Sequence, residues 1–391
     1  MALFTPTKLG SVTIPNRIGM SALTRNRSDH TVPNAIMLEY YVQRAKGGTG
    51  FIVTEGTLPS RQGTEWPNAP GIFNQEQIDG WKKIVDAVHA EGSKIYCQLL
   101  HLGRISHPDA PEQLAAGEPV WAPSAISARG GKFRLLPGVP GYVTPTEVPD
   151  PTVLIAQIKQ AAVNAKKAGF DGVELHGANG YLVAQFLETH SNQRTDKWGG
   201  SVENRTRFAL ETLKALIEVY GENVSIKINP AGGYNGEYLF QDHHSKTDSE
   251  SVSDMGMPLQ DAIDTYSYLL KAVDTMGLSY VALVRYSEAF DPEYDGKKRG
   301  TPHDIVATYS PFLQKTPIWV NSGVTPEEAE KLVSGGEIAG VFFGFAQITC
   351  PDVGYRIKAG IPLDNAPDLK HTYGIEGVDY AIGYTDYPAA K

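Results

Sequence analysis

Short apolar runs alternate with longer amphipathic segments along most of this chain of 391 residues, and no other feature of the sequence limits its fold as strongly. Short apolar runs are typical of buried strands, and longer segments with a helical period are typical of helices. Eight such strands, separated by seven helix-bearing connections, predict an α/β protein with a (β/α)8 TIM barrel, in which residues 1–391 form a single domain. The expected strands are 17–23, 51–54, 94–99, 172–175, 225–228, 280–284, 318–320 and 340–343.

Local start and stop signals add helices, a hairpin cap and extended loops. Helices are expected over 34–46, 75–90, 153–168 and 202–220, and Ser201 can cap the last of them. Residues 301–304 predict a helix start with a threonine cap and a proline at the first position, and residues 325–328 predict a capping box. We expect residues 3–18 to form a hairpin that closes the bottom of the barrel, 107–151 a long Pro/Gly-rich loop, and 361–391 a C-terminal tail.

Composition and charge narrow the class of partner. The chain is 41% hydrophobic and 20% charged, which is enough apolar material for a large core. A net charge of −9 and a pI near 5.6 disfavour a general role on nucleic acid or on an anionic membrane. The N-terminus lacks the pattern of a signal peptide and no stretch is long enough to span a bilayer, so a cytoplasmic location is expected. Nothing marks Cys97 or Cys350 as a metal ligand or disulfide partner, and no metal is expected.

The stretch after the fourth expected strand carries the most chemistry. His176, Asn179 and Tyr181 fall within six positions, with glycines between them. His176 and Asn179 are one turn apart, so both can offer N–H groups to a single oxygen, and Tyr181 supplies a phenolic O–H nearby. Two donors on a carbonyl and a proton source suit the stabilisation of an enolate. The alternative is a core histidine with a turn asparagine and a packing tyrosine, and the residues alone leave the two hypotheses about even.

Polar residues and glycines also follow the other strands, as a barrel requires, because functional groups of such barrels gather at the carboxyl ends of the strands. Gly323 and Gly344, after the last two strands, fall where barrel enzymes hold a phosphate with backbone N–H groups, although turns need glycine in any case. The groups at strand ends are Thr24, Glu55, Gly56, Gln98, His176, Lys227, Asn229, Gly323 and Gly344.

Two long motifs carry a resemblance to a known family. Residues 176–187 read His-x-x-Asn-Gly-Tyr-Leu-x-x-Gln-Phe-Leu, and residues 192–205 read Asn-x-Arg-Thr-Asp-x-aromatic-Gly-Gly-Ser-x-Glu-Asn-Arg. Together they closely resemble the Old Yellow Enzyme family of flavin-dependent ene-reductases. Thr24, rather than a cysteine, at the position expected next to the flavin resembles the classical branch of that family. Matching segments run from Leu3 to Tyr387, nearly the whole chain. The resemblance implies non-covalently bound FMN, with NADPH or NADH as hydride donor.

The same resemblance implies which residues hold FMN, and it shows two departures. Lys227 stands where the family usually has an arginine, and it keeps the positive charge but loses the planar fork of a guanidinium. Phe345 stands where the family typically has an arginine on the phosphate, which predicts weaker FMN binding. The expected set is Ala22, Leu23, Thr24, Gly56, Gln98, His176, Lys227, Gly323, Val324, Gly344 and Phe345.

On the substrate side, the resemblance makes His176 and Asn179 the pair that binds the carbonyl or nitro oxygen, and Tyr181 the proton donor to the α-carbon. Leu100 stands where an indole is common, which predicts a wider pocket. Tyr234 and Tyr384 complete the expected substrate-binding residues, although packing at the barrel rim is nearly as good an interpretation of Tyr384.

Residues 236–256 interrupt the family pattern with a polar insertion. Because it follows the fifth strand, we expect it on the active-site face, where it could act as a lid. Its adjacent histidines, His243 and His244, are interpreted as solvent-facing rather than as metal ligands.

Two functions from different classes remain open. The first is an FMN-dependent NAD(P)H oxidoreductase that reduces activated C=C bonds of α,β-unsaturated carbonyl or nitro compounds. It would act on a small molecule, without nucleic-acid or membrane partners, as a monomer or homodimer. The alternative is a weakly flavin-loaded barrel that acts as an isomerase or cyclisation helper, or as a non-catalytic binding protein. Phe345 and the insertion motivate this alternative.

Overall fold

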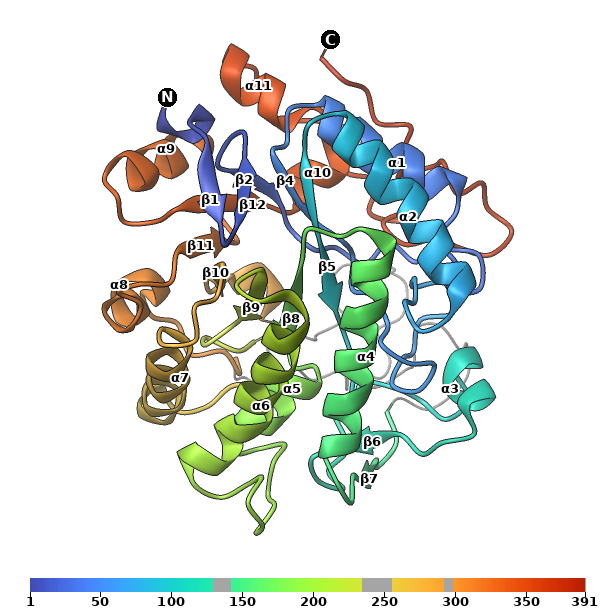
Figure 1. The fold of residues 1–391 in the computed structure, drawn as a ribbon, viewed down its shortest axis with the longest axis vertical. Helices are drawn as coiled ribbons and strands as arrows, with labels where there is room; N and C mark the ends of the chain where they lie inside the picture. The colour runs from blue at the N-terminus through green and yellow to red at the C-terminus, as the bar shows by residue number, and fades with distance from the viewer. Residues whose placement is uncertain (129–141, 234–254, 292–297, 391) are drawn as a thin grey trace.

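The computed structural model describes residues 1–128, 142–233, 255–291 and 298–390, and its centre is a closed barrel of eight parallel strands (Figure 1). The barrel prediction is confirmed, and the strands close in the order β10-β11-β12-β3-β4-β5-β8-β9. These strands are β3 (Ile18–Met20), β4 (Phe51–Val53), β5 (Lys94–Leu99), β8 (Gly172–Gly177), β9 (Val224–Ile228), β10 (Tyr280–Val284), β11 (Ile318–Asn321) and β12 (Gly340–Phe343).

A helix lies in each of the seven connections between these strands, as the alternating pattern predicts. The helices cover the outside of the barrel, so each turns its apolar face to the strands. They are α1 (Ala35–Lys46), α2 (Gln75–Ala90), α4 (Thr152–Ala168), α6 (Val202–Tyr220), α7 (Leu259–Val273), α8 (Ile305–Tyr309) and α9 (Pro326–Ser334), with α10 (Phe345–Thr349) and α11 (Val353–Ala359) after the last strand.

One of the expected helix starts needs correction, and another is confirmed without one of its expected hydrogen bonds. The helix after β10 begins at Ile305, capped by Asp304, and not at residues 301–304. Asp304 accepts the capping hydrogen bond from the Ala307 N–H at 3.0 Å, while Thr301 donates its N–H to Ala231 O and its hydroxyl to Met257 O. Helix α9 has only half of a capping box: Thr325 accepts from the Glu328 N–H, while the Glu328 carboxylate accepts from Arg285 at 2.7 Å.

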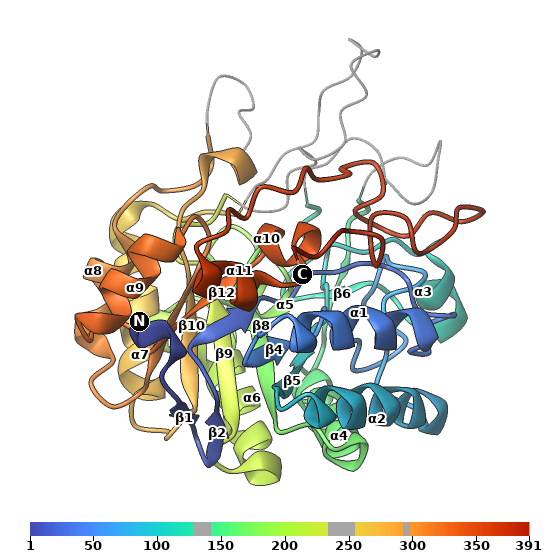
Figure 2. The ribbon, with the colours of Figure 1, turned by 90° about the horizontal axis from the view of Figure 1, so that it is seen from above.

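The N-terminal hairpin closes the amino-terminal end of the barrel, as predicted. Strands β1 (Thr7–Leu9) and β2 (Val12–Ile14) pair antiparallel, and Leu9 and Ile14 are fully buried against rings inside the barrel. Figure 2 shows the hairpin at one end of the barrel and α10 at the other. One mouth is therefore plugged by apolar side chains, and the carboxyl ends of the strands form the other.

The barrel interior changes from aromatic to polar along its axis. Near the hairpin, the Phe51 ring lies 5.0 to 5.9 Å from four other rings, those of Tyr96, Tyr280, Trp319 and Phe342. Towards the carboxyl ends, the inward positions of β5, β8 and β9 are Gln98, Glu174, His176 and Lys227, all at most 7% exposed. Buried polar groups need partners, so this upper layer is where a functional site is expected.

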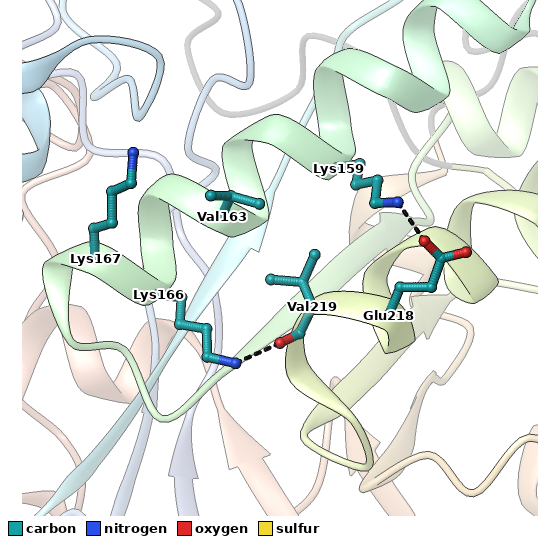
Figure 3. A pocket seen from close by; sticks show the side chains of 6 residues that line it. All are labelled: Lys159, Val163, Lys166, Lys167, Glu218 and Val219. Carbon is teal, nitrogen blue, oxygen red and sulfur yellow. Dashed lines mark hydrogen bonds and ion pairs between the residues drawn. The ribbon is translucent and has the colours of Figure 1, made fainter.

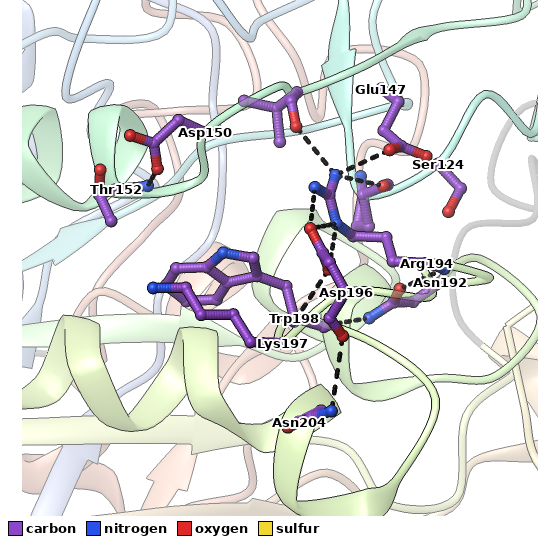
Figure 4. Close-up of polar contacts among 12 residues, drawn as sticks. Ser124, Glu147, Asp150, Thr152, Asn192, Arg194, Asp196, Lys197, Trp198 and Asn204 are labelled. Atoms are coloured by element: carbon purple, nitrogen blue, oxygen red, sulfur yellow. Dashed lines mark hydrogen bonds and ion pairs between the residues drawn. The ribbon is translucent and has the colours of Figure 1, made fainter.

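The excursion between β5 and α4 is more ordered than the predicted loop. Its described residues contain α3 (Pro111–Ala116) and a small parallel ribbon, β6 (Trp121–Ala122) with β7 (Thr146–Glu147). The ribbon is fastened by Arg194, which donates to Pro123 O at 3.1 Å and Val148 O at 2.8 Å and pairs with Asp196 (Figure 4). The second sequence motif is therefore largely scaffold: it joins the excursion to the connection between β8 and α6.

Among the helices of the described ranges, none combines the length and apolar character needed to cross a bilayer. A shallow groove with three lysines lies outside the barrel, between α4 and α6 (Figure 3). Two of these lysines are engaged, because Lys159 pairs with Glu218 and Lys166 donates to Val219 O. The groove lies at the C-terminal ends of both helices, and thus at the end of the barrel opposite the functional rim.

Candidate active site

The expected site residues lie in the described structure at the carboxyl ends of the barrel strands, apart from Tyr234 and Tyr384. Residues 22–24 follow β3, Gly56 follows β4, and Leu100 follows β5. Gly323 and Val324 follow β11, and Gly344 and Phe345 lie between β12 and α10. Residues far apart in sequence are joined at this rim, as Ser21 and Asn321, 300 positions apart, are by a hydrogen bond of 3.2 Å.

His176, at the end of β8, is a neutral hydrogen-bond donor. Its ring is 7% exposed, and burial together with the positive charge of Lys227 lowers its pKa to about 3. Its Nδ1 accepts a hydrogen bond from the Ala178 backbone N–H at 3.3 Å. A neutral imidazole carries one proton, so with Nδ1 acting as acceptor that proton resides on Nε2. His176 thus offers a single N–H donor that does not titrate near neutral pH.

The turn after β8, which contains Asn179, brings Tyr181 beside this histidine. Asn179 and Gly180 both have left-handed backbone conformations, with φ of +55° and +73°. Asparagine and glycine tolerate this region better than other residues, so the sequence Asn-Gly suits two consecutive left-handed positions. The turn places the Tyr181 ring perpendicular to the imidazole, 5.0 Å between centroids. Buried Gln185 supports the turn by donating to Gly180 O and Leu102 O, both at 2.8 Å.

Glu174 links two of the expected cofactor residues, Gln98 and Lys227. Its Oε1 accepts from Gln98 Nε2 and its Oε2 from the Tyr280 hydroxyl, both at 2.7 Å. Burial raises the pKa of Glu174, while the charge of Lys227 and the two donated hydrogen bonds oppose that rise. Burial likewise lowers the pKa of Lys227, against the attraction of Glu174, and the ammonium donates to Ser21 Oγ at 3.1 Å. Each charge thus compensates part of the burial cost of the other.

The glycines and Leu100 shape the backbone of the rim. A Cβ on Gly56 would lie 2.2 Å from Leu100 Cδ2, so only glycine allows the chain after β4 to approach Leu100 this closely. Leu100 itself is 2% exposed and packs with Leu58 and Leu102. At Gly323, φ is +67° and nothing lies within 4 Å of where a Cβ would be, which leaves its backbone accessible.

These residues fit a flavin. Within the described ranges, the buried ammonium of Lys227 donates only one hydrogen bond to the protein, so it retains donors for a ligand. Gln98 keeps its carbonyl oxygen and one amide N–H after donating to Glu174. The pyrimidine edge of FMN needs both donors and acceptors, and its reduced form benefits from a nearby cation. In this arrangement Gln98 and Lys227 would hold the ring, and the loops after β11 and β12 would hold the phosphate.

Tyr384, expected to bind substrate, packs in the described structure against α1 and the arginines that follow β3. Its ring is fully buried and stacks on Tyr40 of α1 at 4.0 Å, and the Arg27 guanidinium lies 4.6 Å from the ring centroid. Buried arginines hold the surrounding tail, since Arg25 donates to Gly383 O and Arg44 to Tyr384 O. This favours the packing interpretation. Tyr234, residues 236–254 of the insertion, and its two histidines lie outside the described residues.

Glu174, Tyr280 and Ser21 belong to the polar layer but were not predicted as site residues. The signal that could have found Glu174 is strand alternation, because Glu174 and His176 are two positions apart and therefore face the same side of β8. A charged residue at an inward position of a barrel strand calls for a partner. The partners themselves lie 76 and 106 residues away, beyond the reach of a local pattern.

The rim of this closed barrel holds a buried cation, Lys227, an oriented amide, Gln98, and accessible loops after the last two strands. This combination points to the class of flavin-binding barrel oxidoreductases. The chain belongs to the NADH:flavin oxidoreductase / NADH oxidase family, whose model matches residues 2–364. This confirms the resemblance to Old Yellow Enzyme. The chain is accordingly an NAD(P)H-dependent flavin oxidoreductase that uses FMN.

Individual relatives match over nearly their whole length. The chain is 34% identical to 12-oxophytodienoate reductase 7 of Oryza sativa subsp. japonica over 394 residues, covering 99% of this chain and 94% of that protein. It is 35% identical to a probable flavin mononucleotide-dependent alkene reductase of Leishmania infantum over 395 residues, 98% and 96% of the two chains. Morphinone reductase in complex with tetrahydroNAD superimposes with a TM-score of 0.81 at 32% identity, covering 100% and 98%.

Proposed function

We propose that this protein reduces activated C=C bonds of α,β-unsaturated carbonyl or nitro compounds, with His176, Asn179 and Tyr181 acting on the substrate. The observation that carries the proposal is the position of His176, buried at the end of β8 with its Nδ1 accepting from the Ala178 N–H, which leaves Nε2–H as the donor of a neutral imidazole. A donor of this kind stabilises negative charge on a substrate oxygen and cannot itself be lost by titration near neutral pH. The relatives named as an alkene reductase and a 12-oxophytodienoate reductase support this substrate class.

Each residue has a defined part in the reaction. His176 Nε2–H and the Asn179 amide bind the carbonyl or nitro oxygen, and their attraction strengthens as that oxygen gains negative charge. FMN, when bound, supplies the hydride that adds to the β-carbon. Tyr181 holds the proton for the α-carbon on its phenolic oxygen. The turn at Asn179–Gly180 and the Gln185 hydrogen bonds keep Tyr181 beside His176 throughout.

Anaerobic reduction and reoxidation test this function. The purified protein should be yellow, lose its visible absorbance on adding NADPH or NADH, and regain it on adding 2-cyclohexenone with formation of cyclohexanone. A yellow protein that NAD(P)H reduces but that neither an enone nor a nitroalkene reoxidises would contradict the substrate class. The weakly flavin-loaded or non-catalytic alternative is not favoured, because the family and the named relatives are reductases.

Three finer points remain proposals. We propose small molecules as the only partners, because the net charge of −9 disfavours polyanions. We further propose a cytoplasmic location. We also propose that the protein is a monomer or homodimer, and size-exclusion chromatography with light scattering can test this oligomeric state.

A further inference from the structure

We propose that Glu174 is a positioning residue that fixes the orientation of the Gln98 amide and offsets the charge of Lys227, and that it thereby sets both the affinity and the reduction potential of bound FMN. The proposal rests on FMN lying against Gln98 and Lys227. It does not depend on which alkene the protein reduces.

Glu174 occupies the centre of the polar layer. It is 1% exposed, in the middle of β8, and its neighbour in register on β5 is Gln98. Both carboxylate oxygens are engaged at 2.7 Å, one by Gln98 Nε2 and one by the Tyr280 hydroxyl. Tyr280 is itself fully buried, so this side of the carboxylate faces the protein interior. Glu174 therefore acts on a ligand only through the residues around it.

The charge of Glu174 decides which way the Gln98 amide faces. Each Glu174 oxygen accepts a hydrogen bond, as the oxygens of a carboxylate do, and the ammonium of Lys227 on the adjacent strand favours that charged form. Turning the amide over would place its carbonyl oxygen against Glu174 Oε1, two acceptors at hydrogen-bond distance, which is unfavourable. Gln98 is thus held with its NH2 group on Glu174 and its carbonyl oxygen available to a donor on the ligand. A neutral amide at position 174 could pair with either orientation of Gln98 and would release this constraint.

The same carboxylate moderates the positive charge next to the cofactor. Lys227 is 5% exposed and lies on β9, the strand paired with β8, two positions beyond Ser225, the register partner of Glu174. The charge of Glu174 acts on the pKa of Lys227. Bound FMN gains negative charge on reduction, and a nearby cation favours that state while a nearby anion disfavours it. Glu174 and Lys227 together hold the layer near electrical neutrality, because the neighbouring His176 is uncharged. Removing the carboxylate charge leaves Lys227 unopposed and should favour reduced FMN.

Three variants separate the two effects. Glu174→Gln removes the charge and keeps the shape, so the midpoint potential of the holoprotein should become more positive and oxidised FMN should bind roughly tenfold more weakly to the apoprotein. Glu174→Asp keeps the charge but shortens the side chain, so the potential should stay close to wild type while FMN binding weakens. Tyr280→Phe removes the other hydrogen bond and keeps the carboxylate and its Gln98 contact, so it serves as the matched control. Because the lost bond opposes the raised pKa of Glu174, any shift of the potential should be smaller than in Glu174→Gln.

The potential is measured by equilibration with reference dyes, and the affinity by the loss of FMN fluorescence on titration with apoprotein. The proposal would be overturned if the midpoint potential of Glu174→Gln were unchanged or more negative than that of the wild type. It would also be overturned if Tyr280→Phe shifted the potential as much as Glu174→Gln does, and Glu174 would then have a purely structural role. If Glu174→Gln does not bind FMN, Glu174→Asp still tests the proposal. Wild-type affinity for FMN in Glu174→Asp would show that Glu174 does not position Gln98. Failure of the wild-type protein to reduce an enone would refute the proposed function without changing these outcomes.

Discussion

His176→Ala gives the sharpest test of the proposed chemistry, because the structure leaves this side chain a single hydrogen-bond donor. Nδ1 is occupied by the Ala178 N–H and burial holds the ring neutral, so the substitution removes one neutral donor and no charge. Loss of one preorganised donor to a developing oxyanion costs about 2–4 kcal/mol of transition-state stabilisation. That corresponds to roughly 30- to 900-fold in rate. The expected loss falls on the reaction with the alkene.

The assay mixes NADPH-reduced protein with 2-cyclohexenone in an anaerobic stopped-flow instrument and follows the return of flavin absorbance. His176→Ala should slow this step by the stated factor, and a phenol should give a weaker long-wavelength charge-transfer band with the oxidised protein. His190→Ala, at an exposed histidine of the same connection, is the matched control. Thermal unfolding of both variants accounts for the lost ring contact with Tyr181.

The pH dependence of the same step decides whether the neutral-donor reasoning is right. A histidine whose pKa lies at about 3 should contribute no ionisation to the reaction between pH 5 and 8. A rate that falls with a midpoint between pH 6 and 7 in the wild type, and that loses this dependence in His176→Ala, would mean that His176 acts as an imidazolium. His176 would then be a charged donor and not the neutral one proposed here.

Three further outcomes are expected. Tyr181→Phe should slow reoxidation by an enone but leave reduction by NAD(P)H nearly unchanged, and stopped-flow traces in which both half-reactions slow equally would remove Tyr181 from the role of acid. Phe345→Arg should tighten FMN binding by about 1–3 kcal/mol without changing riboflavin binding, because the added guanidinium acts on the phosphate, and titration of apoprotein measures both. Burial lowers the pKa of His101 to about 4. As the pH falls, the unfolded chain therefore binds a proton at this histidine before the folded protein does. The contribution of neutral His101 to the free energy of unfolding is complete above pH 6.5 and is lost as the pH falls towards 4. Between pH 7.5 and 5, His101→Gln should therefore lose about 2 kcal/mol less unfolding free energy than wild type in urea titrations, and equal losses would contradict the assignment.

Much of the fold follows from local patterns. The limits of α2, β5, α6, β10 and β12 agree with the sequence prediction, because each has a clear apolar period and most have a cap or a glycine at an end. The predicted start of α8 was wrong because both Thr301 and Asp304 have the residue type of a cap, and it is Asp304 that accepts from the Ala307 N–H. Thr301 instead donates to Ala231 O and Met257 O, distant backbone that a local window does not contain.

The sequence by itself determined the barrel, the family and the stretch that carries the chemistry, because periodicity and motif spacing are properties of neighbouring residues. Only the tertiary structure decided the state of that chemistry. Burial and Lys227, on the adjacent strand, make His176 neutral, and the Ala178 N–H places its proton on Nε2. The tail stacks Tyr384 on Tyr40, and strands β5 and β10 bring Gln98 and Tyr280 to Glu174. Desolvation and charge act through space, so the properties they set emerge only when the barrel closes.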